Sequence, residues 1–140
     1  FREALRTYID QSADFRCISI YGDPTGALKG LPKDQPDVVL MDLQMPGMSG
    51  IDCIASLRQD SPDIRAIMLT VFEQDENIFK ALAAGAYGYL LKRTPPPKIL
   101  DAIREVMEIF NSSPAAFLRG LPFQPAAFNM VLTLCRFWVP

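Results

Sequence analysis

Histidine is absent from this chain of 140 residues. Its absence excludes Ser-His-Asp and Cys-His catalysis within the chain, and it also excludes metal sites with histidine ligands. Phosphate-cradling motifs are missing too, because neither GxGxxG nor GxxxxGK occurs. Any chemistry must therefore rest on carboxylates, hydroxyls, lysines and backbone groups.

Cysteine is scarce, and long apolar runs are lacking. Cys17, Cys53 and Cys135 are odd in number, widely spaced and without a CxxC motif, which indicates free thiols in a reducing compartment. No apolar stretch approaches the roughly 20 residues that span a bilayer. No signal peptide opens the sequence. We expect a cytoplasmic protein with no membrane contact.

Neither sign of charge dominates. The 14 basic and 16 acidic residues leave a net charge of −2, without any run of lysine or arginine. The sequence therefore provides no global electrostatic reason to bind nucleic acid or an acidic membrane. A hydrophobic content of 49% and a charged content of 21% are ordinary for about one globular domain with a real core.

The most informative segment is Val38–Gly50. Four large apolar residues, Val38–Met41, indicate a strand buried on both faces, and Asp42 follows at once. Met-Pro-Gly then predicts a turn, and Ser49 is a suitable N-cap for a helix. A carboxylate is thus expected at the carboxyl end of a buried parallel strand, where open α/β sheets bind ligands. The alternative is a surface aspartate that only begins a turn.

Helices and strands are predicted to alternate along the chain. The predicted helices are 1–12, 25–31, 51–58, 75–84 and 94–110, and the predicted strands are 16–21, 38–41, 64–69 and 87–91. This order predicts an α/β fold with a doubly wound parallel sheet and right-handed crossovers. Because the first element is a helix that needs a strand before it, the first strand of the sheet is expected to be missing.

Two further polar residues directly follow predicted strands. Thr70 and Lys92 would meet Asp42 at one edge of a parallel sheet. A carboxylate nucleophile with an ammonium group and a hydroxyl beside it suits phosphoryl transfer to the carboxylate. Taken singly, Lys92 could be a solvated lysine, Thr70 a loop hydroxyl that satisfies the backbone, and Tyr89 a half-buried strand aromatic.

Four segments together resemble a known family: residues 1–6, 36–50, 69–72 and 81–92. Over residues 1–110 the sequence resembles the receiver (phosphoacceptor) domain of bacterial two-component response regulators, most closely the LuxR/NarL-type transcriptional regulators. The resemblance implies a flavodoxin-like (CheY-like) doubly wound sheet. It also implies a signalling domain rather than an enzyme.

The resemblance assigns roles to individual residues. It implies that Asp42 accepts a phosphoryl group from a sensor histidine kinase and that Lys92 binds this group. Thr70 and Tyr89 would be the switch pair, and the backbone carbonyl of Gln44 would be a Mg²⁺ ligand. The donor histidine belongs to the kinase, so a receiver without histidine is consistent with this role.

The sequence departs from the family pattern at its beginning. Family members start with a strand that ends in an acidic pair, which holds Mg²⁺, and this strand and pair are absent before Phe1. With only Asp42 and the Gln44 carbonyl as protein ligands, a hard cation that prefers octahedral oxygen would be weakly held or lost. The sequence is therefore interpreted as an N-terminally truncated receiver.

The second departure is the tail, residues 111–140, which contains no acidic residue and no helix-turn-helix pattern. A truncated or out-of-frame reading is one interpretation, and a linker or disordered segment is another. In a third interpretation the apolar segment Met130–Val139 fills the vacated strand position. DNA contact would require an output domain that is missing here, and a homodimer remains open.

Three functions follow from these observations. The first is a phosphoacceptor receiver that controls transcription through an output domain. The second is a degenerate, non-phosphorylated receiver that acts as a protein-interaction module, which the absent acidic pair favours. The third, a flavodoxin-like enzyme or nucleotide binder, would need a phosphate-cradling loop, and the sequence has none.

Overall fold

The computed structural model describes residues 2–45, 47–71, 73–111 and 128–133, and for residues 2, 108–111 and 128–133 it describes the backbone only. The helices are α1 (Arg2–Gln11), α2 (Pro24–Asp34), α3 (Gly50–Asp60), α4 (Asp75–Ala84) and α5 (Pro96–Asn111). The strands are β1 (Phe15–Tyr21), β2 (Val38–Met41), β3 (Arg65–Thr70), β4 (Gly88–Leu91) and β5 (Phe128–Thr133). None of the described helices is long and apolar enough to cross a membrane.

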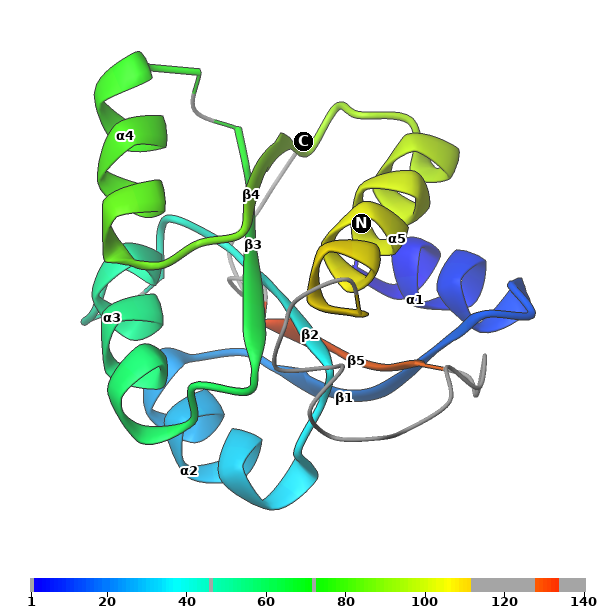
Figure 1. Cartoon of the computed structure of the whole chain (residues 1–140), viewed down its shortest axis with the longest axis horizontal. Coiled ribbons are helices and arrows are strands. Elements are labelled where there is room, and N and C mark those ends of the chain that lie inside the picture. The colour runs from blue at the N-terminus through cyan, green and yellow to red at the C-terminus, as the bar shows by residue number, and fades with distance from the viewer. Residues whose placement is uncertain (1, 46, 72, 112–127, 134–140) are drawn as a thin grey trace.

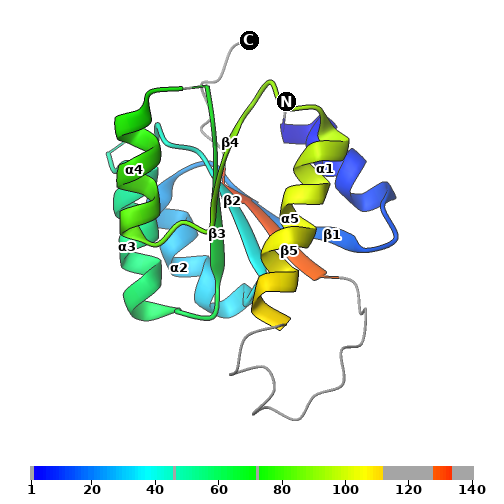
Figure 2. The ribbon, with the colours of Figure 1, turned by 45° about the horizontal axis from the view of Figure 1, so that its top comes forward.

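The strands form one sheet in the order β1-β5-β2-β3-β4, and every neighbouring pair is parallel. Helices α1 and α5 cover one face of the sheet, while α2, α3 and α4 cover the other (Figures 1 and 2). The predicted doubly wound α/β fold is confirmed. The carboxyl ends of all five strands consequently lie at the same edge.

The predicted elements recur with small changes of length. The strand Val38–Met41 and the helix Asp75–Ala84 have their predicted bounds. Helix α2 is longer than predicted because it continues through Pro32 to Asp34. Its start is capped by Asp23, whose Oδ1 accepts the Gly26 N–H at 2.7 Å, and it ends at Gln35 in the left-handed conformation (φ 46°).

Strand β5 is the main difference from the favoured interpretation of the tail. Residues 128–133, expected to be linker, disordered or out-of-frame chain, form a strand between β1 and β2. The central position predicted to lack a strand is therefore occupied, as the third interpretation proposed. The strand begins two residues before Met130, and residues 134–139 of the predicted segment lie outside the described residues. The division of the chain at residue 110 stays a prediction.

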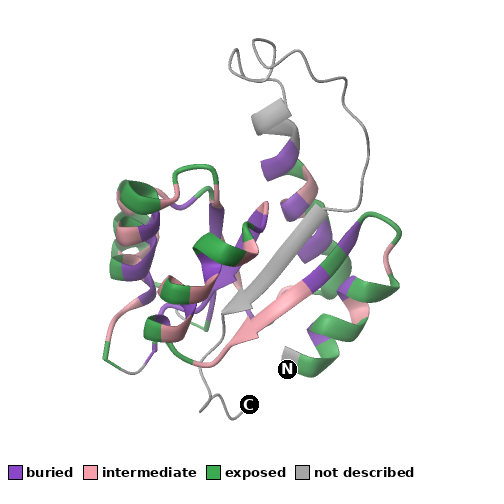
Figure 3. Ribbon diagram, turned by 90° about the horizontal axis from the view of Figure 1, so that it is seen from below, coloured by how far each residue is buried: buried purple, intermediate pink, exposed green. Residues whose placement is uncertain are grey.

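Two apolar clusters, one on each face of the sheet, form the core. Side chains alternate along β2, so Val38 and Leu40 belong to the cluster beneath α1 and α5, and Val39 and Met41 belong to the opposite cluster. All four are at most 1% exposed. Figure 3 shows buried residues between the layers of the molecule and exposed residues on the outer faces of the helices. Burial on both faces explains the uninterrupted apolar run.

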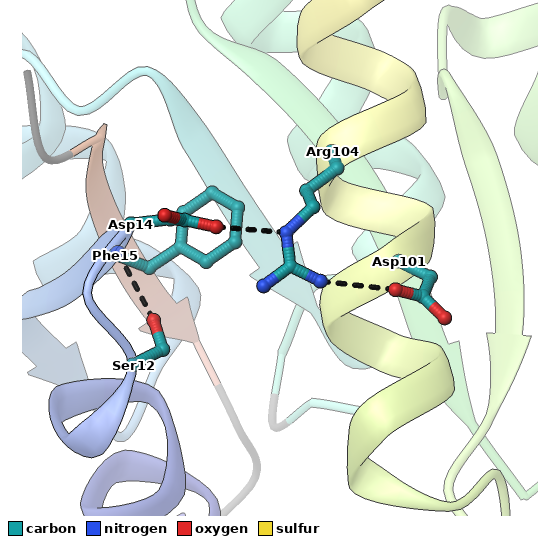
Figure 4. Close-up of polar contacts among 5 residues, drawn as sticks. All are labelled: Ser12, Asp14, Phe15, Asp101 and Arg104. Atoms are coloured by element: carbon teal, nitrogen blue, oxygen red, sulfur yellow. Dashed lines mark hydrogen bonds and ion pairs between the residues drawn. The ribbon is translucent and has the colours of Figure 1, made fainter. Parts of the chain in front are cut away.

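Arg104 links α5 to the junction between α1 and β1 (Figure 4). Its Nε donates to Asp14 Oδ2 and its Nη1 donates to Asp101 Oδ1, both at 2.9 Å. The guanidinium carbon lies 5.4 Å from the centroid of the buried Phe15 ring. The Phe15 N–H in turn donates to Ser12 Oγ at 3.1 Å. This contact brings α5 against the start of β1.

We expect the Arg104–Asp14 pair to add only about 0.5 kcal/mol to the free energy of unfolding. The two side chains are 40% and 50% exposed, so water and salt screen their attraction. A double-mutant cycle with Arg104→Gln and Asp14→Asn, measured by urea unfolding at low and high salt, checks this value. A coupling free energy well above 1 kcal/mol that is insensitive to salt would contradict it.

Candidate functional site

Asp42 and Lys92 form a buried ion pair at the carboxyl edge of the sheet. Lys92 Nζ lies 2.6 Å from Asp42 Oδ2, and the two residues are 6% and 4% exposed. Asp42 directly follows β2, and Lys92 directly follows β4. The structure thus brings together two groups that are 50 residues apart in the sequence.

Thr70 lies between them in the order of the strands. It is the last residue of β3 and is completely buried. Its backbone carbonyl accepts the Lys92 N–H at 2.8 Å, which ties the ends of β3 and β4 together. The predicted meeting of Asp42, Thr70 and Lys92 at one edge is therefore what the structure shows.

The turn after Asp42 holds the carboxylate in place. Asp42 Oδ1 accepts the Gln44 N–H at 3.2 Å, while the other oxygen, Oδ2, contacts Lys92. Gly47 has a φ of +83°, as a glycine in a tight turn permits. Ser49 then caps α3, its hydroxyl accepting the Asp52 N–H at 3.1 Å. Both oxygens of the Asp42 carboxylate therefore have partners that define its orientation.

Gly50 is a residue of the site whose role the sequence did not reveal. Its N–H donates to the Leu43 carbonyl at 2.8 Å, and a Cβ at this position would lie 2.0 Å from the backbone oxygen of Asp42. The first turn of α3 can approach the acidic residue closely only because Gly50 has no side chain. The sequence signal was a glycine where the helix begins.

Tyr89 lies on β4 within the electrostatic field of Asp42. Burial, and secondarily the negative charge of Asp42, raise the pKa of its phenol above 10.0. The ring packs against the apolar cluster that contains Met41 and Met68. Tyr89 is therefore coupled to the negative charge of Asp42 from β4, which is separated from β2 by β3 in the sheet.

The described residues do not fit a bound Mg²⁺ ion. Among them, no three histidine, cysteine, aspartate or glutamate side chains gather closely enough to hold a metal. The Asp42 carboxylate is already neutralised by the Lys92 ammonium group. Mg²⁺ prefers several oxygen ligands in octahedral geometry, and in the described part of the chain no cluster of three such side chains includes Asp42. The absence of the family's acidic pair stays a prediction.

Comparison with known proteins identifies the same class of domain that the sequence resembles. A family model for the response regulator receiver domain matches residues 1–104. The transcriptional regulatory protein YxjL of Bacillus subtilis (strain 168) is 38% identical over 103 residues, which are 74% of this chain and 47% of that protein. The response regulator protein VraR of Staphylococcus aureus (strain NCTC 8325 / PS 47) is 32% identical over 104 residues, 74% of this chain and 50% of VraR.

Solved structures agree in fold. A LuxR-family two-component response regulator from Aurantimonas sp. SI85-9A1 superposes with a TM-score of 0.73 at 29% identity, covering 76% of each chain. The receiver domain of the response regulator NarL from Mycobacterium tuberculosis gives a TM-score of 0.71 at 28% identity, covering 74% of this chain and 84% of that one.

The parallel sheet with helices on both faces, together with the family model that matches residues 1–104, identifies a signal-receiver domain. The chain belongs to the response regulator receiver family of two-component systems, with LuxR/NarL-type homologues. It spans about half the length of the curated relatives that it matches. Receiver domains are generally non-enzymatic signalling modules that interact with histidine kinases and typically bind Mg²⁺.

Replacing Gly50 by alanine should lower the free energy of unfolding by about 3 kcal/mol, because the new Cβ forces α3 away from the Asp42 carbonyl. Chemical denaturation measures this loss. Gly88→Ala is the matched control, since its Cβ would meet Ile67 at an ordinary 3.6 Å and should change stability by under about 1 kcal/mol. Equal effects of the two substitutions would show that the close approach is not required.

Asp42→Asn should bring the pKa of Tyr89 down towards 10.0, because it removes the negative charge that opposes ionisation of the phenol. Because the pKa of Tyr89 is higher in the folded state than in the unfolded state, its contribution to stability is fully present below pH 10.0. This contribution is lost as the pH rises through the folded-state pKa. Ring signals in an NMR pH titration report each tyrosine separately. Tyr21 is the internal control, because its pKa is raised by burial and by Asp34. Its pKa should not change in the Asp42→Asn variant.

Proposed function

We propose that this chain is a phosphoacceptor receiver in which Asp42 takes a phosphoryl group from a sensor histidine kinase. The observation that carries the proposal is the buried contact of 2.6 Å between Asp42 Oδ2 and Lys92 Nζ. Burying two charges costs free energy unless they are paired. Here the buried pair lies at the edge of the sheet where open α/β folds bind ligands, which favours a functional role for the carboxylate.

The carboxyl edge supplies a nucleophile and groups that can bind a phosphoryl group. An oxygen of the Asp42 carboxylate attacks phosphorus, the bond from phosphorus to the donor breaks, and the leaving group departs with the bonding electron pair. An acyl phosphate results. Lys92 neutralises charge on the phosphoryl oxygens, and the Thr70 hydroxyl is the candidate hydrogen-bond donor to them. No step is routed through a metal ion, because the described residues offer no cluster of three side-chain ligands for one.

The charge that phosphorylation adds would act on the neighbouring strands. Lys92 would exchange a carboxylate oxygen for phosphoryl oxygens, and Thr70 and Tyr89 would respond as the switch pair. We assign control of transcription to an output domain outside this chain, through dimerisation and DNA binding of the kind LuxR-type regulators often show. The proposed location is the cytoplasm, where such kinases deliver their phosphoryl groups.

One observation favours a second function, a non-phosphorylated interaction module with the receiver fold. Among the described residues, Asp42 belongs to no cluster of three or more potential metal-binding side chains, and only 4% of Asp42 is exposed. A receiver whose aspartate is inaccessible to donors would keep its surfaces for binding proteins. Phosphorylation of Asp42 distinguishes the two functions.

Incubation with acetyl phosphate at millimolar Mg²⁺ should add the mass of one phosphoryl group, which intact-protein mass spectrometry detects and hydroxylamine removes. Asp42→Asn should abolish the adduct because the nucleophile is gone. Lys92→Met should lower the initial rate about 100-fold, because the phosphoryl oxygens lose their charged partner. Asp52→Asn, a change to an exposed carboxylate on α3, is the matched control and should leave the adduct intact.

Repeating the reaction without Mg²⁺ separates the contribution of the metal ion to the initial rate from that of Lys92. An adduct on the wild-type chain that Asp42→Asn does not remove would place the modification elsewhere and contradict the proposal. The absence of any adduct in a chain shown to be folded by circular dichroism would favour the interaction module.

A further inference from the structure

Strand β5 holds the two halves of the sheet together. Its register pairs Val131 with Ser19 of β1 on one side and with Val39 of β2 on the other. In the described part of the sheet, β1 and β2 are joined only through β5. Without an occupant, the position between them would expose the backbone groups of two strand edges, which are costly to leave unpaired in a core. We call this position the strand slot, bounded by Phe15–Tyr21 and Val38–Met41.

The strand slot selects a particular kind of segment. β1 and β2 run in the same direction, so an occupant must be parallel to both. All four residues of β2 are buried, and they alternate between the two apolar clusters, so an occupant must tolerate apolar surroundings on both faces. Phe128–Thr133, with the sequence FNMVLT, has apolar residues at four of its six positions. Its composition matches this requirement.

We propose that the strand slot is an exchangeable binding site for an extended, apolar, parallel peptide segment, and that the chain fills it with its own residues 128–133. Main-chain hydrogen bonds to two strand edges provide the affinity, as in other cases of strand addition. The segment belongs to the same chain as the slot, so it binds intramolecularly and competes at a higher effective concentration than a free peptide in dilute solution. The tethered segment therefore excludes a free peptide of the same sequence.

Strand β5, the occupant of the slot, also supports the carboxyl edge of the sheet where Asp42 lies. Thr133 pairs with Met41, the residue immediately before Asp42. A seated β5 thus fixes the end of β2, and with it the backbone position of Asp42. This inference concerns strand pairing and does not rest on phosphorylation, so either proposal can fail without the other.

Binding of a labelled peptide tests the exchangeable site. The probe has the sequence of residues 128–133 with flanking lysines for solubility, and its fluorescence anisotropy is measured with the full chain. Val131→Pro removes one backbone N–H and prevents regular pairing at the centre of β5, so this variant should bind the probe about tenfold or more tightly than the wild-type chain. Val131→Ala keeps the N–H and should behave like the wild-type chain. A probe carrying the same proline should bind neither.

The experiment distinguishes its outcomes even if the Val131→Pro variant is unfolded in the absence of the probe. Recovery of its circular dichroism on adding the probe supports the proposal, as does direct binding to a folded variant. Equal binding by the wild-type chain and the variant overturns it. A probe that neither binds nor refolds the variant overturns it as well, and so does a proline variant with wild-type stability.

Amide hydrogen exchange on the unmodified chain gives a second, independent measurement. The amides of Met130–Leu132 should be protected to within about tenfold of those in β2, because they belong to the same sheet. Exchange at the rate of unstructured chain in Met130–Leu132, while β2 and β3 stay protected, would show that the slot is not filled by this segment.

Discussion

Parallel pairing of β2 with a neighbour on each side is the constraint on which the rest of the structure depends. β2 is only four residues long, is buried throughout, and separates the two apolar clusters. A strand in this position needs hydrogen-bonded partners at both edges, which β3 and β5 provide. The stable end of β2 is what gives Asp42 a defined position at the carboxyl edge.

The buried ion pair at that edge is better explained by the groups that it positions than by the stability that it adds. A carboxylate and an ammonium group that are both almost fully buried gain little net stability over apolar residues of the same size. The pair does hold a carboxylate and a positive charge 2.6 Å apart at the edge where open α/β sheets bind ligands. Gly50 permits this arrangement by allowing α3 to begin directly against the Asp42 carbonyl.

Much of the fold and the site could be predicted because the relevant signals are local. The apolar run Val38–Met41 and the acidic first turn of Asp75–Ala84 give their elements directly, and strand ends place Asp42, Thr70 and Lys92 at one edge. The tail was harder. Its composition, without acidic residues or helical periodicity, favours an out-of-frame, linker or disordered segment over a strand, because nothing local shows that a position between two distant strands is open. The function of Gly50 was missed for the same reason, since it depends on the carbonyl of another element.

The sequence by itself determined the alternation of helices and strands, the receiver family and the identity of the residues at the carboxyl edge of the sheet, because periodicity, turn residues and strand-end side chains are local features of consecutive positions. Only the tertiary structure decided that Lys92 reaches Oδ2 of Asp42, that Gly50 must lack a side chain and that residues 128–133 join β1 to β2. Each of these depends on distances between segments far apart along the chain, and such distances follow from packing rather than from local pattern.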